Sequence, residues 1–527
     1  MWARFTFEDL RIIVHYLGML LIGSAAIMLP SIVTAILFQE WNPLTRYITS
    51  IGACTAIGSL LCFVKISPEK LSRQQAVAVT GFAWLVLSLA ASFTLYYSGH
   101  YIQYTDALFD AFSAYTTTGA SLITDLDHLS NADNMMRFMM HFCGGLGIIV
   151  IALSLGIFGR GTSAALFTGE GRSEHVIPNI VTATRFILRI TILVVSITTI
   201  ILFLIMMADG LAPTRALLHA FWMAITAYVT GGFAPMSDSI MYYNSIAIEV
   251  VCMFAMLLGT ISYSLIYWIF KGKPMMFFDD IEIKTGLIWI VVMTAIFTAS
   301  ALQSSYISNL PALVHRGTFT IISAFTTTGL TVISQNQLKT VLSSGAFVTL
   351  ALIMAVGGSA GSTAGGIKFD RIGIIVKSIV LTIKQSVSPS TAKVTSEYYH
   401  VGRKQLEPTV VKNAMTIFIL FVITYTLGTL AGITHGYDAS LSMFEAIALT
   451  SNGGVTCGIA VSGMQVGLEL IYILLMWAGR LEFIALLSLI AQIVASFRPQ
   501  NHKHRIKRDT NKTSVLDYLA NDEPPKF

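Results

Sequence analysis

Long apolar segments separated by short polar ones occupy most of the chain. A helix needs about 20 consecutive, mostly apolar residues to cross a bilayer, and ten stretches approach or exceed that length. They cover 12–37, 50–64, 77–97, 136–158, 186–208, 245–270, 285–303, 344–382, 411–433 and 466–496. The pattern predicts an all-α integral membrane protein with about ten transmembrane helices in a lipid bilayer. The eighth stretch is interrupted by small residues, so we expect a broken helix there.

Composition excludes a soluble globular protein. Hydrophobic residues make up 54% of the chain and charged residues only 12%. The five cysteines lie mostly inside apolar stretches and lack the spacing of metal ligands or of a disulfide framework, so we expect small core residues. The sequence contains no His-Glu-x-x-His motif, Ser/His/Asp set or nucleotide fingerprint. We therefore predict that the protein is not an enzyme.

Lysine and arginine residues beside the apolar stretches indicate the orientation. If successive stretches alternate in direction, the basic clusters all face one side; they lie around 65–73, 160–189, 271–284, 377–412 and 498–508. Cytoplasmic loops carry such an excess of positive charge, so we predict that both termini are cytoplasmic. The basic run 501–508 is then a juxtamembrane flank, and we expect no nucleic-acid binding.

A second kind of apolar segment is too short to cross a bilayer and ends in a glycine. It occurs four times, as Ser113–Gly119, Thr226–Gly232, Ser323–Gly329 and Ile447–Gly453. Threonine-rich backbone before a glycine is typical of an ion filter, in which main-chain carbonyls line the path and one residue is free of Cβ constraints. A single copy could occur by chance and would not indicate a filter. Four similar copies predict four filter segments. Gly454 is an alternative to Gly453 in the last copy.

Short helices are predicted to lead into these glycines from the outer side. Pro213 and Pro311 stand near the starts of two of them, where a helix tolerates a missing amide, and Asp106 and Asp438 stand near the starts of the others, beside the positive end of the helix dipole. Four helices whose carbonyl ends converge on one cavity would stabilise a cation there.

The spacing of the glycines, roughly a hundred residues, exceeds the period of about 20 to 50 that is usual for solenoids and indicates four subdomains. We predict two extra N-terminal transmembrane helices in 1–70, followed by four pore repeats and a cytoplasmic tail. The repeats are 71–165, 166–275, 276–395 and 396–500, and the tail is 501–527.

The filter copies and the motifs that follow them resemble the Trk/Ktr/HKT potassium-transporter superfamily, and most closely the bacterial TrkH-type membrane subunit. These motifs are HFCGGLGIIV at 141–150, GGSAGSTAGGIK at 357–368 and GRLE at 479–482. The resemblance implies four helix-pore-helix units around a pseudo-fourfold pore in the cell inner membrane. It implies a transported potassium ion, with no organic cofactor in this chain.

In such a pore, potassium is bound by main-chain carbonyls of the residues before each glycine. The resemblance places these at Thr117 and Thr118, Thr230 and Gly231, Thr327 and Thr328, and Ser451 and Asn452. It places the turns at Gly119, Gly232, Gly329 and Gly453. In related plant proteins a serine at the first glycine goes with sodium preference, so Gly119 favours potassium.

The glycine-rich run 357–366 allows three interpretations. A phosphate-binding loop would need a preceding strand and Gly-Lys-Ser/Thr, and a close-packed stripe of small residues is common between membrane helices. The third interpretation is a break in the inner helix of repeat three, which the resemblance identifies as an intramembrane gate. The gating residues would be Gly357, Gly358, Gly361, Gly365 and Gly366, together with Arg480.

Arg480 is an ionisable residue inside the last apolar stretch, where a charge is costly and usually faces water or a partner. By resemblance it lies beside the pore under the filter and opposes cation passage. The alternative is an anchor that binds carbonyls of the gate loop and has no role in permeation. Glu482 is two positions away and would lie on another helix face, so we expect no pair between them.

The function implied by the resemblance is potassium uptake through a gated, potassium-selective central pore. A homodimer and a cytoplasmic nucleotide-binding, TrkA-like regulatory ring subunit are implied as partners. One alternative is a sodium- or proton-coupled potassium symporter. An alternative of another class is a non-conducting sensor or scaffold with a pore fold.

Overall fold

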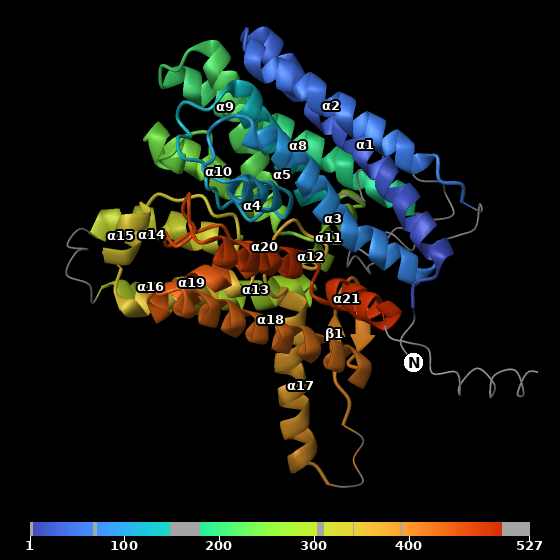
Figure 1. The fold of residues 1–527 in the computed structure, drawn as a ribbon. Coiled ribbons are helices and arrows are strands. Elements are labelled where there is room, and N and C mark those ends of the chain that lie inside the picture. Colours follow the sequence, from blue (N-terminus) through green and yellow to red (C-terminus); the bar gives the residue numbers. More distant parts are fainter. Residues whose placement is uncertain are drawn as a thin grey trace, which may run out of the picture.

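The computed structural model describes residues 4–66, 71–147, 180–302, 310–340, 342–389, 392 and 394–497. Its elements, labelled in Figure 1, are almost all helices. They are α1 (Phe7–Leu37), α2 (Trp41–Cys62), α3 (Arg73–Tyr96), α4 (Tyr104–Tyr115), α5 (Asn131–Leu146), α8 (Ile180–Ala208), α9 (Pro213–Tyr228), the 3-10 helix η1 (Ser239–Tyr243), α10 (Ile246–Gly259), α11 (Tyr263–Phe270), α12 (Met275–Asp279), α13 (Ile281–Ala301), α14 (Leu310–Phe325), α15 (Gln335–Thr340), α16 (Ser344–Ala355), α17 (Phe369–Val387), α18 (Pro408–Thr434), α19 (Ala439–Thr450), α20 (Val466–Arg480) and α21 (Ile484–Phe497). Strands β1 (Glu397–Tyr399) and β2 (Arg403–Gln405) form a small antiparallel hairpin.

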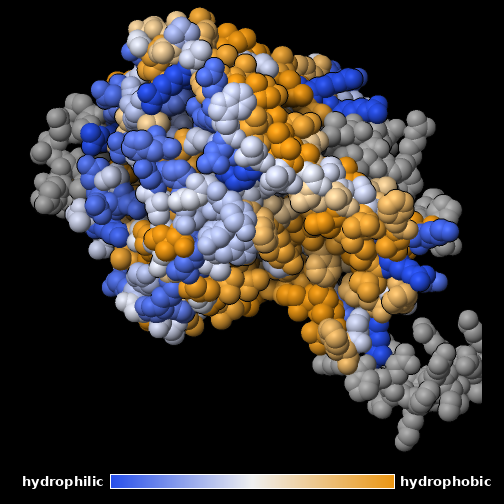
Figure 2. Space-filling model, turned by 45° about the horizontal axis from the view of Figure 1, so that its top comes forward, coloured by the Kyte–Doolittle hydropathy of each residue, from blue (hydrophilic) through white to orange (hydrophobic). Residues whose placement is uncertain are grey.

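The long helices confirm a membrane protein. Within the described residues, α1, α3, α8, α13 and α18 are each long and apolar enough to cross a bilayer, and the pairs α10–α11 and α20–α21 satisfy the same criterion as bent spans. Figure 2 shows a broad hydrophobic surface next to a face rich in hydrophilic residues. Such an extended apolar exterior is stable only against lipid. Every predicted stretch overlaps a helix or a broken helix pair, although the second helix already begins at Trp41.

The helices repeat in the order long helix, short helix, inner helix. The four sets are α3–α4–α5, α8–α9–α10/α11, α13–α14–α16/α17 and α18–α19–α20/α21, with α1 and α2 as a leading hairpin (Figure 1). The short helices α4, α9, α14 and α19 are the predicted pore helices. Pro213 starts α9, and the Asp438 side chain caps α19 by accepting a hydrogen bond from Ser440 N at 2.8 Å. The predicted limits of the repeats stay predictions, and the one at 165/166 lies outside the described residues.

Within the described residues, inner helices are broken in three repeats, whereas we predicted one break. The predicted interruption lies between α16 and α17, where residues 356–368 are not helical. The pairs α10–α11 and α20–α21 are also bent, by 96° and 115°. A single glycine precedes each of these bends, Gly259 at the end of α10 and Gly479 next to the end of α20, and one glycine does not by itself predict a break. At the second of them Glu482 and Phe483 have positive φ, which is uncommon for residues other than glycine.

The two ends of the described chain meet. Phe5 N donates a hydrogen bond to Ser496 Oγ at 3.0 Å, so the N-terminus and the end of α21 lie on the same side of the molecule. This agrees with the predicted common side of the termini, while the side itself stays a prediction. The tail 501–527, the second half of the stretch 136–158 and most of the basic cluster around 160–189 lie outside the described residues.

Candidate ion-conduction site

All four pore helices end in the same backbone motif. The residue two positions before the turn glycine has a left-handed conformation, with φ of 56° at Thr117, 51° at Thr230, 52° at Thr327 and 53° at Asn452. The next N–H then bonds back to a carbonyl inside the last helical turn, at 2.9 Å for Thr118, 2.8 Å for Gly231, 2.9 Å for Thr328 and 2.7 Å for Gly453. This is the hydrogen bond of a helix C-cap. The repeated cap shows that the four segments are structurally equivalent.

The glycines that follow the caps form a closed ring. A Cβ atom built on Gly119 would lie 2.4 Å from Gly231 O, and one on Gly232 would lie 2.3 Å from Thr328 O. The contacts continue from Gly329 to Gly453 O at 2.9 Å and from Gly454 to Thr118 O at 2.1 Å. Each glycine therefore touches the carbonyl oxygen of the next repeat, and the fourth returns to the first. Only glycine leaves room for this approach.

The fourth segment corrects our predicted register by one residue. Gly454, with φ of 62°, takes the place of Gly119, Gly232 and Gly329 in the ring, and Gly453 is not the turn residue. Asn452 and Gly453 thus correspond to Thr117 and Thr118, in place of the predicted Ser451 and Asn452. In this register Ala448 corresponds to Ser113, because these are the residues six positions before the two turn glycines. Asparagine tolerates the left-handed conformation, so Asn452 could have indicated the correct register.

Side chains next to the ring form hydrogen bonds with one another. Thr116 Oγ1 lies 2.8 Å from Thr118 Oγ1, and the same pair recurs between Thr326 and Thr328 at 2.8 Å. Asn452 Nδ2 donates to Thr118 Oγ1 at 2.9 Å and so joins the fourth segment to the first. All five residues are buried. These hydrogen bonds fix the positions of the main-chain carbonyl oxygens of the ring. Fixed carbonyl oxygens can replace the water shell of a cation.

Two buried carboxylates support the outgoing chain beyond the ring, and the sequence analysis missed both. Asp110 in α4 accepts a hydrogen bond from Leu122 N at 2.8 Å, and Glu445 in α19 accepts one from Cys457 N at 2.7 Å. They are equivalent positions once Gly454 is aligned with Gly119. The available signal was an acidic residue in the middle of an apolar helix at the same distance before the glycine.

Inner helices approach the ring through glycines. A Cβ on Gly144 would lie 1.8 Å from Tyr115 O, one on Gly259 would lie 2.1 Å from Tyr228 O, and one on Gly479 would lie 1.8 Å from Thr450 O. In each case the carbonyl belongs to the end of the pore helix in the same repeat. Close backbone contact thus fixes the height of each pore helix.

Cavities lie on both sides of the ring. The one beyond the glycines measures about 240 Å³ and is lined by Gly119, Gly232, Gly329 and Gly454, with Arg137 and Gln335 at its wall. The one on the opposite side measures about 50 Å³, and its lining includes Asn452, Gly365, Lys368 and Arg480. The first lining contains the four turn glycines, and the second contains Asn452 of the fourth filter segment beside residues of the predicted gate. A path along the ring axis would therefore pass the filter first and the predicted gate next.

The non-helical loop 356–368, which contains the predicted gate run 357–366, packs directly against the filter segments. Gly365 N donates to Thr327 Oγ1 at 2.7 Å, and Thr363 Oγ1 donates to Tyr228 O at 3.2 Å. A Cβ on Gly365 would lie 2.0 Å from Ser451 O. The segment joins two helices and breaks the inner span, so it is neither a phosphate-binding loop after a strand nor a continuous packing stripe. Gly358, Gly361 and Gly366 have positive φ, as a non-helical loop requires, and Gly357 lies beside Thr327.

Arg480 connects three parts of this region. Its guanidinium donates to Thr117 Oγ1 at 3.2 Å, to Thr363 O at 3.1 Å and to Gly145 O at 3.3 Å, and it also contacts Gly144 O. The side chain thus ties the first filter segment and the end of α5 to the gate loop. Through these hydrogen bonds Arg480 anchors the gate loop to the first filter segment and to α5. The positive charge also lines the cavity beneath the ring.

An ion pair links the broken inner helices of repeats three and four. Arg371, in the first turn of α17, forms an ion pair with Glu482 at the bend between α20 and α21. Glu482 is therefore engaged with another helix, in agreement with the prediction that it does not pair with Arg480. Lys368 donates to Ala364 O and closes the gate loop on itself.

Comparisons with known proteins agree over nearly the whole chain. Residues 44–498 match the family model described as TrkH, cation transport protein. An uncharacterized cation transporter of Methanocaldococcus jannaschii is 29% identical over 93% of this chain and 97% of its own. The Trk system potassium uptake protein TrkH of Halomonas elongata is 27% identical, covering 91% and 98%.

The crystal structure of the potassium transporter TrkH from Vibrio parahaemolyticus superposes with a TM-score of 0.76 at 24% identity. The superposition covers 91% of this chain and 98% of that one. This similarity supports the fold. The family model covers well over half of the chain. The chain belongs to the TrkH family of cation transport proteins.

Proposed function

We propose that this protein takes up potassium across the cytoplasmic membrane through the pore that the four repeats enclose. The observation that carries the proposal is the closed ring in which each turn glycine touches a carbonyl oxygen of its neighbour. Relatives of similar length are Trk system potassium uptake proteins. The cargo is a monovalent cation that main-chain oxygens bind without its water shell.

The proposed potassium ligands are the carbonyls of the two residues before each turn glycine. They are Thr117, Thr118, Thr230, Gly231, Thr327, Thr328, Asn452 and Gly453, with Gly119, Gly232, Gly329 and Gly454 at the turns. The four pore helices point their carbonyl ends at this ring. Each helix C-terminus carries a partial negative charge, so the four together would offset part of the dehydration cost of the ion.

The proposed gate is the loop 356–368 with Arg480. Its contacts with Thr327 and Ser451 place it immediately beneath the ring, where a shift of the loop would open or close the path. Bonds from Arg480 to both the loop and the filter would couple such a shift to the filter.

Orientation and partners belong to the proposal as well. The positive-inside rule favours cytoplasmic termini, and the contact between Phe5 and Ser496 supports a common side for both. Family resemblance adds a homodimer and a cytoplasmic nucleotide-binding, TrkA-like regulatory subunit.

Rubidium uptake into liposomes that contain the purified protein tests this function. We expect uptake down a rubidium gradient without sodium or a proton gradient, because a carbonyl-lined pore needs no coupling ion. Dependence on sodium or protons would support the symporter instead. Absence of flux from protein that remains folded would support the sensor or scaffold.

Gly119→Ser is expected to lower the preference for rubidium over sodium several-fold. A side chain there would meet Gly231 O at 2.4 Å, so the carbonyls of the first and second repeats must separate. A wider ring discriminates less against the smaller sodium ion. Sodium and rubidium uptake in the same liposomes provide the measurement, and unchanged selectivity would count against Gly119 as a filter residue.

A further inference from the structure

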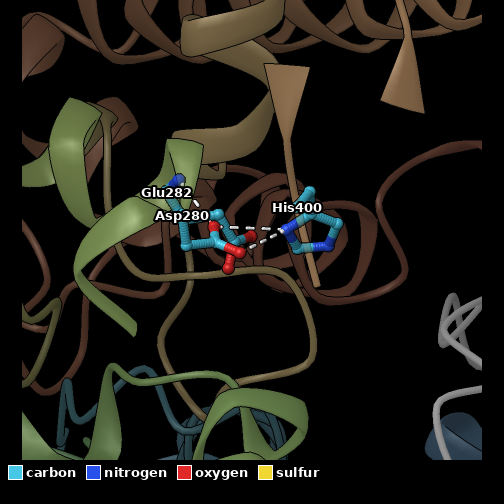
Figure 3. A group of neighbouring side chains, drawn as sticks. All are labelled: Asp280, Glu282 and His400. Carbon is cyan, nitrogen blue, oxygen red and sulfur yellow. Dashed lines mark hydrogen bonds and ion pairs between the residues drawn. The ribbon is translucent and has the colours of Figure 1, made fainter. Parts of the chain in front are cut away.

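Three side chains with metal-ligating atoms meet below the gate loop. Asp280, Glu282 and His400 each offer one such atom, and the three atoms lie within 4.8 Å of one another (Figure 3). The carboxylates of Asp280 and Glu282 are fully buried, and His400 is 6% exposed. The conduction pathway does not use them. They form a constellation of their own at the start of α13.

The fold brings these residues together from distant parts of the chain. Asp280 caps α13, Glu282 lies in its first turn, and His400 stands at the tip of the hairpin formed by β1 and β2. The hairpin tip is held on Asp280, because Val401 N donates to Asp280 Oδ2 at 3.1 Å. The strand beyond the tip, from Arg403, is exposed. Val401 and Gly402, which follow His400 at the tip, are half-buried, so the constellation lies near the surface of the molecule.

The charge of the constellation favours a bound cation. Two buried carboxylates share their site with one imidazole, so the three side chains carry a net negative charge even if the imidazole is protonated. Buried charges are normally paired or coordinate metals, and here Arg371 also interacts electrostatically with Glu282. A divalent ion would neutralise the two carboxylates and would hold both of them.

The spacing of the donor atoms fits a metal shell. His400 Nδ1 lies 3.2 Å from Asp280 Oδ1 and 3.2 Å from Asp280 Oδ2. Two ligands that are each about 2.0–2.2 Å from one tetrahedral ion stand about 3.3–3.6 Å apart, and the Glu282 oxygen lies within 4.8 Å of the other two atoms. An imidazole nitrogen with two carboxylates suits zinc and its neighbours, whereas calcium and magnesium prefer shells made only of oxygen.

We propose that Asp280, Glu282 and His400 bind a divalent transition-metal ion of the zinc type. On binding, the metal replaces the proton on His400 Nδ1, and that proton passes to solvent. Water completes the shell. The oxygen Glu282 Oε1 accepts a hydrogen bond from Ala360 N, in the gate loop, at 2.7 Å. The bound ion thus joins the hairpin to the gate through one carboxylate.

Metal binding by the full-length protein in detergent tests this site. The protein is purified on a histidine-free tag, stripped with a chelator and titrated with Zn²⁺ or Co²⁺. We expect one ion per chain, a Co²⁺ absorption spectrum of nitrogen and oxygen ligands, and a higher midpoint of thermal unfolding with metal, because a ligand that binds the native state stabilises it.

Two variants remove ligands while they preserve local structure. His400→Gln keeps an N–H donor for Asp280, and Asp280→Asn keeps a side chain that caps helices well. Each is expected to weaken metal affinity by at least about ten-fold, the lower end of the loss seen when even outer-shell partners are removed. Each should also lose the thermal stabilisation by metal.

His128→Ala is the matched control. His128 faces Asp125 at 2.9 Å, but this pair is exposed and belongs to no three-residue group among the described residues. Its removal should leave the metal affinity unchanged. The proposal is wrong if wild-type protein binds metal no more tightly than His400→Gln, if His128→Ala weakens binding equally, or if Co²⁺ shows thiolate ligation from the cysteines.

Discussion

Gly454→Ala is expected to reduce rubidium uptake by at least about ten-fold, which corresponds to about 1.4 kcal/mol. The new Cβ would lie 2.1 Å from Thr118 O, a proposed potassium ligand, and the residue has a positive φ that alanine disfavours. A left-handed conformation costs an L-residue about 1–2 kcal/mol, and relief of the overlap must move the carbonyl. The expected loss is therefore one of conduction, measured as the initial rate of uptake into liposomes.

Gly453→Ala serves as the control in the adjacent position. There the Cβ would meet only side-chain atoms, Ser451 Oγ at 3.2 Å and Met354 Sδ at 3.3 Å, and the methionine can move. We expect uptake close to wild type. If Gly453→Ala abolished uptake while Gly454→Ala did not, the register assigned from the backbone would be wrong.

Arg480→Ala is expected to raise basal rubidium flux about ten-fold or more. Two unit charges about 4 Å apart repel each other by about 4 kcal/mol at an effective dielectric constant of about 20, and by about half of that at twice the distance. The guanidinium lines the cavity beneath the ring, so it opposes every cation that leaves the filter. Its removal also frees Thr363 O in the gate loop. Both effects favour an open path.

Arg480→Lys separates the two contributions. Lysine keeps the positive charge but has no planar fork for the separate contacts with Thr117, Thr363 and Gly145. If charge is the main barrier, flux through this variant stays near the wild-type level. If the alanine variant unfolds at a lower temperature and shows no rise in flux, Arg480 is an anchor with no role as a barrier.

Membership in a transport family confirms the prediction of a transporter rather than an enzyme. The four repeats nevertheless differ in how they support the ring. Asp110 and Glu445 brace the first and fourth segments, while Met223 and Thr320 occupy the same positions in the second and third. The four repeats thus share the same backbone conformation at the ring, but only the first and fourth have a buried carboxylate at this position that supports it. Substitutions at equivalent positions should not be expected to act equally.

The amino-acid sequence by itself determined the membrane class, the pore helices and the repeated glycines. These follow from local rules: apolar length sets a span, Pro213 and Asp438 mark helix starts, and Gly119, Gly232 and Gly329 adopt the positive φ that glycine favours. The interruption near 357–366 was equally local, because glycine-rich sequence does not sustain a helix.

Tertiary structure decided the fourth register, the additional bends and the partners of the charged residues. Gly453 and Gly454 have the same intrinsic freedom; Asn452 is a local indication of the register, and contact with Thr118 O selects Gly454. The bend at Glu482 is stabilised across the molecule by Arg371, and the meeting of Asp280 with His400 joins residues far apart in the chain. These features depend on interaction energies between segments that are far apart in the chain. Such energies cannot be derived from the sequence of any one segment.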